Sequence, residues 1–241
     1  MKKLFCITIV IVLLSCLAGC LAEESSNASS TFSVRNGIVF GMTKEQVKEI
    51  ENNNGITSFH VYEDDIDFYT NIAGYDDCHV IYRFNENNAL SQIKYVWGIP
   101  SKKPEEAQAV EACFNNTHII FDSLAESLGG KYKLIGELGS DKEYTFVDFG
   151  TLKNDLQFME EPSSFVFSDV DVYGFKQFIT PSEEGFVEVG IVNEKRDVYI
   201  LGDLFDVSAS CEIVYTYISK EQYDAVIQEG INLKQQRDKD L

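Results

Sequence analysis

Carboxylates are the residues of this chain whose types and spacing most directly suggest chemistry. Four of them cluster in one short stretch: Glu63, Asp64, Asp65 and Asp67. Such oxygen ligands suit Ca²⁺, which takes six to eight of them. On a strand, however, only alternate side chains share a face, so only part of the cluster can converge on one ion. We therefore interpret the cluster as a solvated edge or loop and predict no metal site there.

A second acidic segment begins with Asp169 and Asp171 and has the opening pattern of an EF-hand loop. The twelfth position of such a loop needs an acid, and here it is Thr180. The pattern therefore predicts a strand running into a turn rather than a calcium site.

Histidines offer no better catalytic pattern. His60, His79 and His118 have no HExxH or paired-ligand spacing, and no G-x-S-x-G elbow is present. Cys78 and His79 are adjacent, so on a strand they point to opposite faces and cannot form a dyad with each other. We predict that the protein is not an enzyme and that it needs no cofactor.

Three cysteines lie well inside the chain: Cys78, Cys113 and Cys211. One disulfide with one free thiol is possible, in any of three pairings, because an odd number cannot all pair within one chain. No CxxC spacing is present. We favour unpaired thiols that pack as small apolar side chains.

Aromatic residues are abundant, with 17 Phe, 12 Tyr and a single Trp. Most are expected in a core, since aromatic side chains favour strands. Some could instead line an open face and bind a protein loop or a sugar. Trp97, at the expected end of a strand beside Gly98, and Tyr95 on the same face are the candidate binding residues.

Three helices must position these side chains. Thr43 with Gln46 forms a capping box that opens the first helix, and Ser219 with Gln222 repeats the pattern before the last one. A middle helix is expected to start at Pro104 and to end at the Gly129–Gly130 pair. Its apolar residues recur at helical spacing: Val110, Phe114, Phe121, Leu124, Ala125 and Leu128.

Runs of alternating apolar and polar residues with short turns lie between the helices, which favours antiparallel sheets. The sequence predicts an α+β fold of two tandem helix-plus-antiparallel-sheet units followed by a C-terminal helix. The first expected unit is residues 34–98, and the second is residues 99–218. The boundary is placed at Gly98, where the first run of strands is expected to end. Residues 219–241 form the C-terminal helix and tail.

The N-terminus resembles the leader of bacterial lipoproteins. Lys2 and Lys3 precede an apolar run that is too short to span a bilayer, and Leu17-Ala18-Gly19-Cys20 matches the lipobox. The resemblance implies that residues 1–19 form a signal peptide and that Cys20 is acylated, palmitate being one such acyl group. The polar residues 20–33 would be a flexible tether, and the protein would lie on the extracytoplasmic face of the cell membrane.

Loss of such a leader would make the mature chain strongly acidic. The leader holds two of the 20 basic residues and none of the 39 acidic ones, so 18 and 39 remain, a formal charge of −21. That charge repels nucleic acids and anionic head groups and favours cationic partners. We therefore exclude nucleic-acid binding and expect membrane attachment by lipid.

A second resemblance concerns the segment that follows the tether. Gly41-Met42-Thr43, at the start of the first helix, is similar to the G-M-T opening of BLIP-like modules, which occur in β-lactamase-inhibitor-type proteins and in outer-membrane-assembly lipoproteins. The hairpin around residues 82–90 looks like that of Firmicute lipoproteins with this module. The resemblance covers about residues 36–97 and implies a fold, but no functional residue.

The sequence as a whole predicts a lipid-anchored, non-enzymatic module that binds a protein partner. Two alternatives stay open. One is a lipoprotein that captures a small ligand such as a sugar, a peptide or a cation. The other, which we favour less, is a hydrolase that acts on the cell envelope.

Overall fold

The structure is a computed structural model, and it describes residues 33–138, 144–145, 166–182, 184–228 and 232. Its helices are α2 (Lys44–Asn53) and α3 (Ala107–Gly129); η1 (Pro104–Glu106) is a 3-10 turn before α3, and residues 220–228 are also helical. The strands are β1 (Ser33–Arg35), β2 (Ile38–Val39), β3 (His60–Val61), β4 (Asp65–Ile72), β5 (Tyr75–Phe84), β6 (Leu90–Lys102), β7 (Lys133–Leu138), β8 (Tyr144–Thr145), β9 (Val166–Pro181), β10 (Gly185–Ile200) and β11 (Asp203–Ser219).

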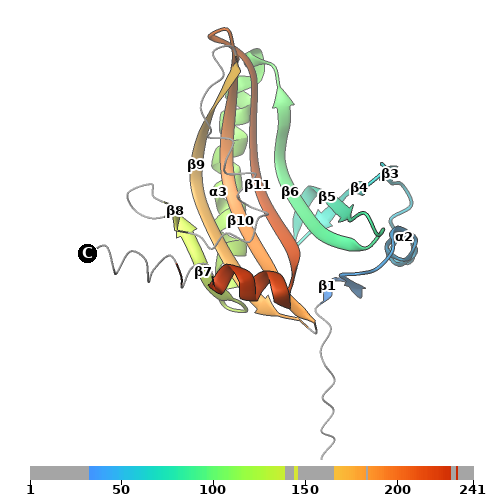
Figure 1. Cartoon of the computed structure of the whole chain (residues 1–241). Coiled ribbons are helices and arrows are strands. Elements are labelled where there is room, and N and C mark those ends of the chain that lie inside the picture. The colour runs from blue at the N-terminus through green and yellow to red at the C-terminus, as the bar shows by residue number, and fades with distance from the viewer. Residues whose placement is uncertain (1–32, 139–143, 146–165, 183, 229–231, 233–241) are drawn as a thin grey trace, which may run out of the picture. The chain divides into compact units, whose positions relative to one another are not determined.

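A single antiparallel sheet of nine strands organises this part of the chain (Figure 1). Its strand order is β3-β4-β5-β6-β11-β10-β9-β7-β8, and β1 and β2 form a separate pair. The prediction of an α+β fold in two tandem BLIP-like units is therefore wrong. Strand β6 pairs with β5 on one side and with β11 on the other, which joins both halves of the chain in one sheet.

Gly98 is the physical reason for that error. The expected boundary between residues 98 and 99 lies inside β6, which runs on to Lys102. Gly98 has a φ of 152°, and a Cβ atom there would lie 2.1 Å from the carbonyl oxygen of Ala209 on β11. The glycine allows a close approach of two paired strands, a role that sequence alone does not distinguish from a turn.

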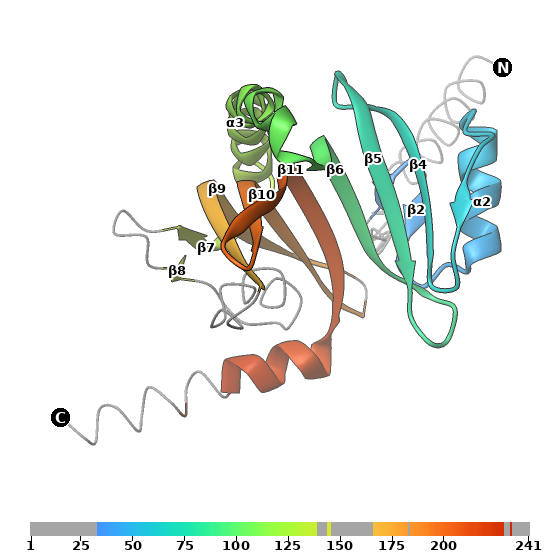
Figure 2. The same cartoon turned by 90° about the horizontal axis from the view of Figure 1, so that it is seen from above.

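Helix α3 covers one face of the sheet and packs on β6, β9, β10 and β11 (Figure 2). The predicted apolar stripe is confirmed, since Val110, Phe114, Phe121, Ala125 and Leu128 are all buried. The predicted end is confirmed as well, because α3 stops at Gly129 with Gly130 as its C-cap. Pro104 starts η1 rather than α3 itself.

Helix α2 covers the same face near the other end of the sheet. Its N-cap Thr43 and Gln46 form the predicted capping box. The pattern recurs before the helical segment 220–228: the Gln222 amide N–H donates to Ser219 Oγ at 3.2 Å, and the Ser219 amide N–H donates to Gln222 Oε1 at 3.0 Å. Val47 of α2 belongs to the same buried apolar cluster as Phe121 of α3, so both helices share one core.

Three hairpin turns have two consecutive residues with positive φ, the type I′ geometry. They are Asn36–Gly37 between β1 and β2, Ala73–Gly74 between β4 and β5, and Leu201–Gly202 between β10 and β11. Asparagine and glycine adopt this conformation readily, whereas Ala73 and Leu201 carry a steric cost of about 1–2 kcal/mol each. The first two turns lie beside the candidate site described next.

Candidate functional site

A cavity of about 410 Å³ opens on the helix-covered face of the sheet. Its lining comes from the β1–β2 and β4–β5 turns, from the C-terminal end of α3 and the residues that follow it, and from strands β6 and β11. Its described lining residues are Arg35, Asn36, Asn71, Ile72, Ala73, Tyr95, Leu124, Ser127, Leu128, Lys131, Tyr132, Ile213 and Tyr215. The site is therefore assembled from five segments that are distant in the sequence.

The charge of the cavity differs from that of the chain. The whole chain has a formal charge of −19. Among the described residues that line the cavity, however, Arg35 and Lys131 are the charged ones, and no aspartate or glutamate joins them. An acidic protein thus has a cationic recess.

A buried network holds Arg35. Its Nε donates to Glu51 Oε1 at 2.8 Å, and the Tyr82 hydroxyl donates to the same oxygen at 2.5 Å. Glu51, on α2, is completely buried, and its Oε2 has no hydrogen-bond partner in the described part of the chain. The guanidinium carbon of Arg35 also lies 5.9 Å from the centre of the Phe68 ring. These contacts tie the Arg35 side chain to buried residues of the core.

The same network keeps Arg35 charged. Burial on its own lowers the pKa of the guanidinium, but the hydrogen bond and the charge of Glu51 outweigh it, so the pKa is raised overall. Arg35 is thus a permanent cation whose side chain is 14% exposed.

Three tyrosines supply most of the aromatic surface of the cavity. Burial raises the pKa of Tyr95, Tyr132 and Tyr215, so all three phenols are neutral at physiological pH. The rings of Tyr95 and Tyr215 meet edge to face with centroids 5.9 Å apart. A ligand would therefore meet neutral tyrosines rather than phenolates.

The two predicted binding residues have different positions. Trp97 is only 3% exposed and packs against Tyr75 and Tyr95, with centroid separations of 6.3 Å in both pairs. It lies in the core, so the expectation of an exposed indole platform does not hold. Tyr95 is also buried, but it lines the cavity. Local spacing could not reveal Arg35, Lys131, Tyr132 and Tyr215, because these residues come from three segments that are distant in the sequence.

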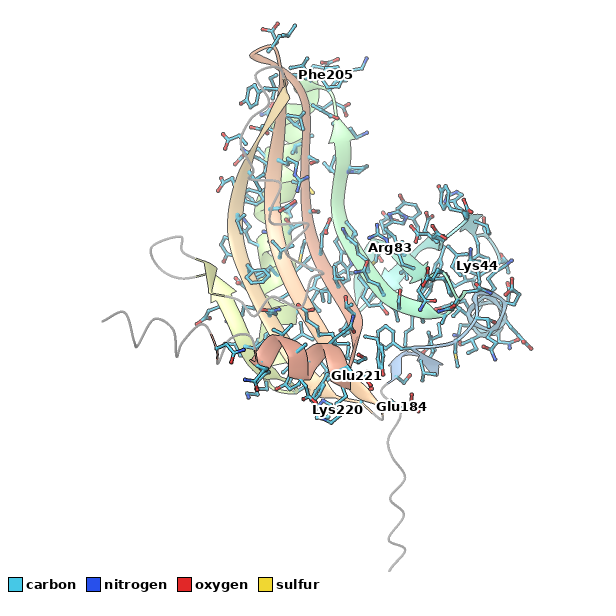
Figure 3. The ribbon with its side chains drawn as sticks, viewed as in Figure 1. Lys44, Arg83, Glu184, Phe205, Lys220 and Glu221 are labelled. Carbon is cyan, nitrogen blue, oxygen red and sulfur yellow. The ribbon has the colours of Figure 1, made fainter. Side chains whose placement is uncertain are left out.

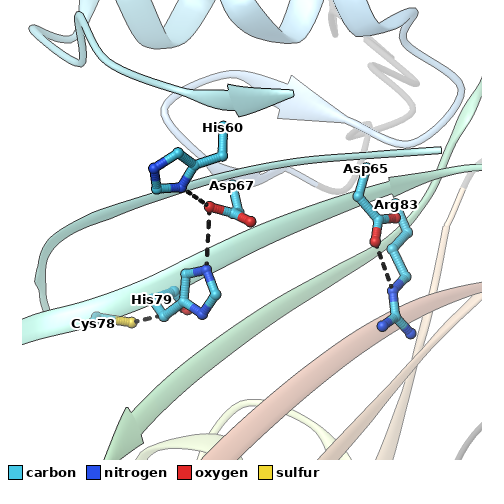
Figure 4. Close-up of polar contacts among 6 residues, drawn as sticks. All are labelled: His60, Asp65, Asp67, Cys78, His79 and Arg83. Atoms are coloured by element: carbon cyan, nitrogen blue, oxygen red, sulfur yellow. Dashed lines mark hydrogen bonds and ion pairs between the residues drawn. The ribbon is translucent and has the colours of Figure 1, made fainter. Parts of the chain in front are cut away.

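Two members of the acidic cluster, Asp65 and Asp67, contact histidine and arginine side chains (Figure 4). Asp67 Oδ1 lies 2.8 Å from His60 Nδ1 and 3.3 Å from His79 Nε2, and Asp65 Oδ2 lies 3.6 Å from Arg83 Nε. The ring of Tyr69 stacks on that of His79 at 4.5 Å. Across the described residues, no three His, Cys, Asp or Glu side chains are placed to hold a metal ion.

Three further sequence predictions concern the acidic segment at residues 169–171, the cysteines and the leader. Asp169 and Asp171 lie within β9, so the strand is present, but the predicted turn after it is not. Cys78, Cys113 and Cys211 are free thiols, as favoured. Burial raises the pKa of Cys78 to about 12, which keeps it a thiol. Cys20 and the leader lie outside the described residues.

Comparisons with known proteins gave no match to a family model, to a curated protein or to a solved structure. Of the helices in the described ranges, none has both the length and the apolar character needed to cross a membrane.

Proposed function

We propose that the mature protein is a lipid-anchored, extracytoplasmic binding protein that captures a small organic molecule in the cavity beside α3. The observation that carries this proposal is the cavity itself. Its volume of about 410 Å³ lies in the range typical of small-molecule sites. Its lining combines aromatic and aliphatic side chains with the polar or charged side chains of Arg35, Asn36, Asn71, Ser127 and Lys131, which can fix the orientation of a bound molecule.

The lining favours binding over catalysis. Its described residues include no histidine, cysteine or carboxylate, so histidine, the most frequent general base, and the carboxylates do not face a bound molecule. The small-ligand alternative thus gains support relative to a hydrolase, and the protein remains a non-enzymatic module in this proposal.

Native mass spectrometry of the lipoprotein, purified in detergent from its own membrane, tests the proposal. We expect a non-covalent small-molecule adduct on the wild type. Ser127→Trp should abolish the adduct, because residue 127 lines the cavity and an indole there would fill it. Ser123→Trp is the matched control, since Ser123 is exposed on the same helix but does not line the cavity. An adduct that survives Ser127→Trp, or no adduct on any of the three proteins, would contradict the proposal.

Lipid attachment is tested separately. Cys20→Ser should prevent both acylation and removal of residues 1–19, because acylation needs the thiol. Intact-mass analysis of the membrane fraction measures both events. A wild-type protein that keeps its leader, or that begins at another residue without lipid, would contradict the anchoring.

A protein partner remains the second candidate function. Leu201 and Phe205, at the β10–β11 turn, are 72% and 60% exposed, and Figure 3 shows Phe205 at that end of the long hairpin. Apolar side chains that are exposed together can form a contact site. Crosslinking from the native membrane, with Leu201→Asn/Phe205→Ser as the paired variant, tests it. A partner retained by the variant would place the contact elsewhere.

A further inference from the structure

Charge distinguishes the cavity from the rest of this acidic chain. The cavity is lined by two cations and, among its described residues, by no carboxylate. Lys131 follows the end of α3, is exposed, and has no ion pair within the described residues. Acidic residues elsewhere on the surface would repel an anion, so a cationic recess is the place where one could be held.

The hydrogen bonds of Arg35 indicate which of its atoms a ligand can use. Arg35 binds Glu51 through its Nε, which donates to Glu51 Oε1. The other carboxylate oxygen, Glu51 Oε2, accepts no hydrogen bond within the described residues. Within the described residues, neither terminal Nη group of Arg35 makes a hydrogen bond or an ion pair. Those groups form the planar fork that binds carboxylate or phosphate oxygens in pairs. The Glu51 contact thus anchors the guanidinium and leaves this fork for a ligand.

The apolar part of the lining limits the rest of the molecule. Ile72, Leu124, Leu128 and Ile213 add aliphatic surface to the tyrosine rings. Such a lining suits an apolar or aromatic body, and the volume lies in the range of sites that bind drug-sized molecules.

We infer that the ligand is an organic anion, with its carboxylate or phosphate on Arg35 and Lys131 and an apolar or aromatic body against Tyr95 and Tyr215. This inference rests on the proposed small-molecule function and names its ligand class. Glu51 and Tyr82 are positioning residues in it, since they act through Arg35.

Four probes of one shape and different charge test the ligand class: phenylacetate, phenyl phosphate, the neutral phenylacetamide and the cationic benzylamine. Titration calorimetry uses the purified lipoprotein in non-ionic detergent. We expect at least one anion to bind about tenfold tighter than the amide, and benzylamine to bind more weakly than the amide. The ratio between phenylacetate and phenyl phosphate identifies which oxyanion the site prefers.

Variants locate the charge preference. Lys131→Gln should weaken anion binding about tenfold and leave amide binding unchanged, whereas Lys103→Gln, an exposed lysine outside the cavity, should change neither. Arg35→Gln/Glu51→Gln removes both charges of the buried pair and so avoids a lone buried charge; it should abolish the preference for anions. Unchanged melting curves for Lys131→Gln separate loss of binding from loss of folding.

The outcomes separate this inference from the proposed function. Equal affinity for anions and amide, or a preference that survives both the Lys131 and the Arg35/Glu51 variants, would overturn the anion inference while leaving small-molecule capture intact. No binding of either anion at about 10 mM would also overturn it. The function itself would be overturned only in the mass-spectrometry experiment, by an adduct that survives Ser127→Trp or by the absence of an adduct on all three proteins.

Discussion

Arg35 and Arg83 each pair with a carboxylate, but in opposite surroundings. Arg35 reaches the completely buried Glu51 across the core, and Tyr82 completes the network. Arg83 is 51% exposed and lies 3.6 Å from Asp65 on the neighbouring strand (Figure 4). Water screens the second pair and not the first, so similar chemical groups have very different consequences for stability.

The comparison also suggests why the buried pair exists. Burying two charges costs desolvation energy that their attraction often fails to recover, so apolar residues would serve stability equally well. Stability is therefore not a sufficient reason to bury this pair. Holding a cation in position to bind a ligand is a separate reason, and it requires the charge. In our proposal the pair holds Arg35 at the cavity, whereas the Arg83 pair has no such task.

The largest expected effect comes from breaking the buried pair. Arg35→Gln leaves the Glu51 carboxylate buried without a counter-charge and should lower the free energy of unfolding by about 3–5 kcal/mol. Urea unfolding followed by circular dichroism measures the loss. A loss below about 1 kcal/mol would show that Glu51 is solvated or neutral in the folded protein.

The double variant Arg35→Gln/Glu51→Gln sharpens the comparison. It removes both charges, so much of the stability lost in Arg35→Gln should return, and the double-mutant cycle should give a coupling of about 1–3 kcal/mol. The same urea experiment measures it. If the stability losses of Arg35→Gln and Glu51→Gln add up to the loss of the double variant, the two side chains do not interact in solution.

An intermediate effect is expected for Tyr82→Phe. This change removes one donor to Glu51 Oε1 and keeps the ring in the core, so the cost is that of a lost hydrogen bond to a buried charged group, about 1–3 kcal/mol. Thermal and urea unfolding give the value. The control is Tyr69→Phe, because Tyr69 is exposed and its hydroxyl has no hydrogen bond within the described residues. Equal losses in both variants would contradict the network.

The smallest effect is expected for Arg83→Gln. An exposed ion pair contributes about 0–1 kcal/mol to the free energy of unfolding, and salt screens the attraction between its charges. The free energy of unfolding should therefore change little, and the difference from wild type should vanish in about 1 M salt. A loss as large as that of Arg35→Gln would mean that exposure does not separate the two pairs.

Several local features could be predicted from the sequence because a few neighbouring residues suffice to specify them. The capping boxes at Thr43 and Ser219 need a partner only three positions away. The apolar stripe of α3 needs only the helical period, and Gly129–Gly130 marks its end. The lipobox before Cys20 is equally local, and its prediction awaits the acylation experiment.

Long-range pairing could not be predicted in this way. Gly98 looks like turn material in the sequence, yet it lets β6 pass close to β11, more than a hundred residues later. The candidate site also depends on residues that are distant in the sequence. Arg35 is 16 residues from Glu51, and Tyr82 is 31 residues from it. Nothing in the neighbourhood of any of the three indicates that they meet.

The sequence by itself determined the capping boxes of the first and last helices, the end of α3 and its apolar face, the acidity of the chain and the lipoprotein-like leader, because each depends on composition or short spacing. Tertiary structure alone decided that strands β3 to β11 form one sheet, that Trp97 lies in the core and that Arg35 and Lys131 share a cavity. Hydrophobic burial is non-directional, so many pairings satisfy the same local pattern. Packing and backbone approach between distant segments select among them.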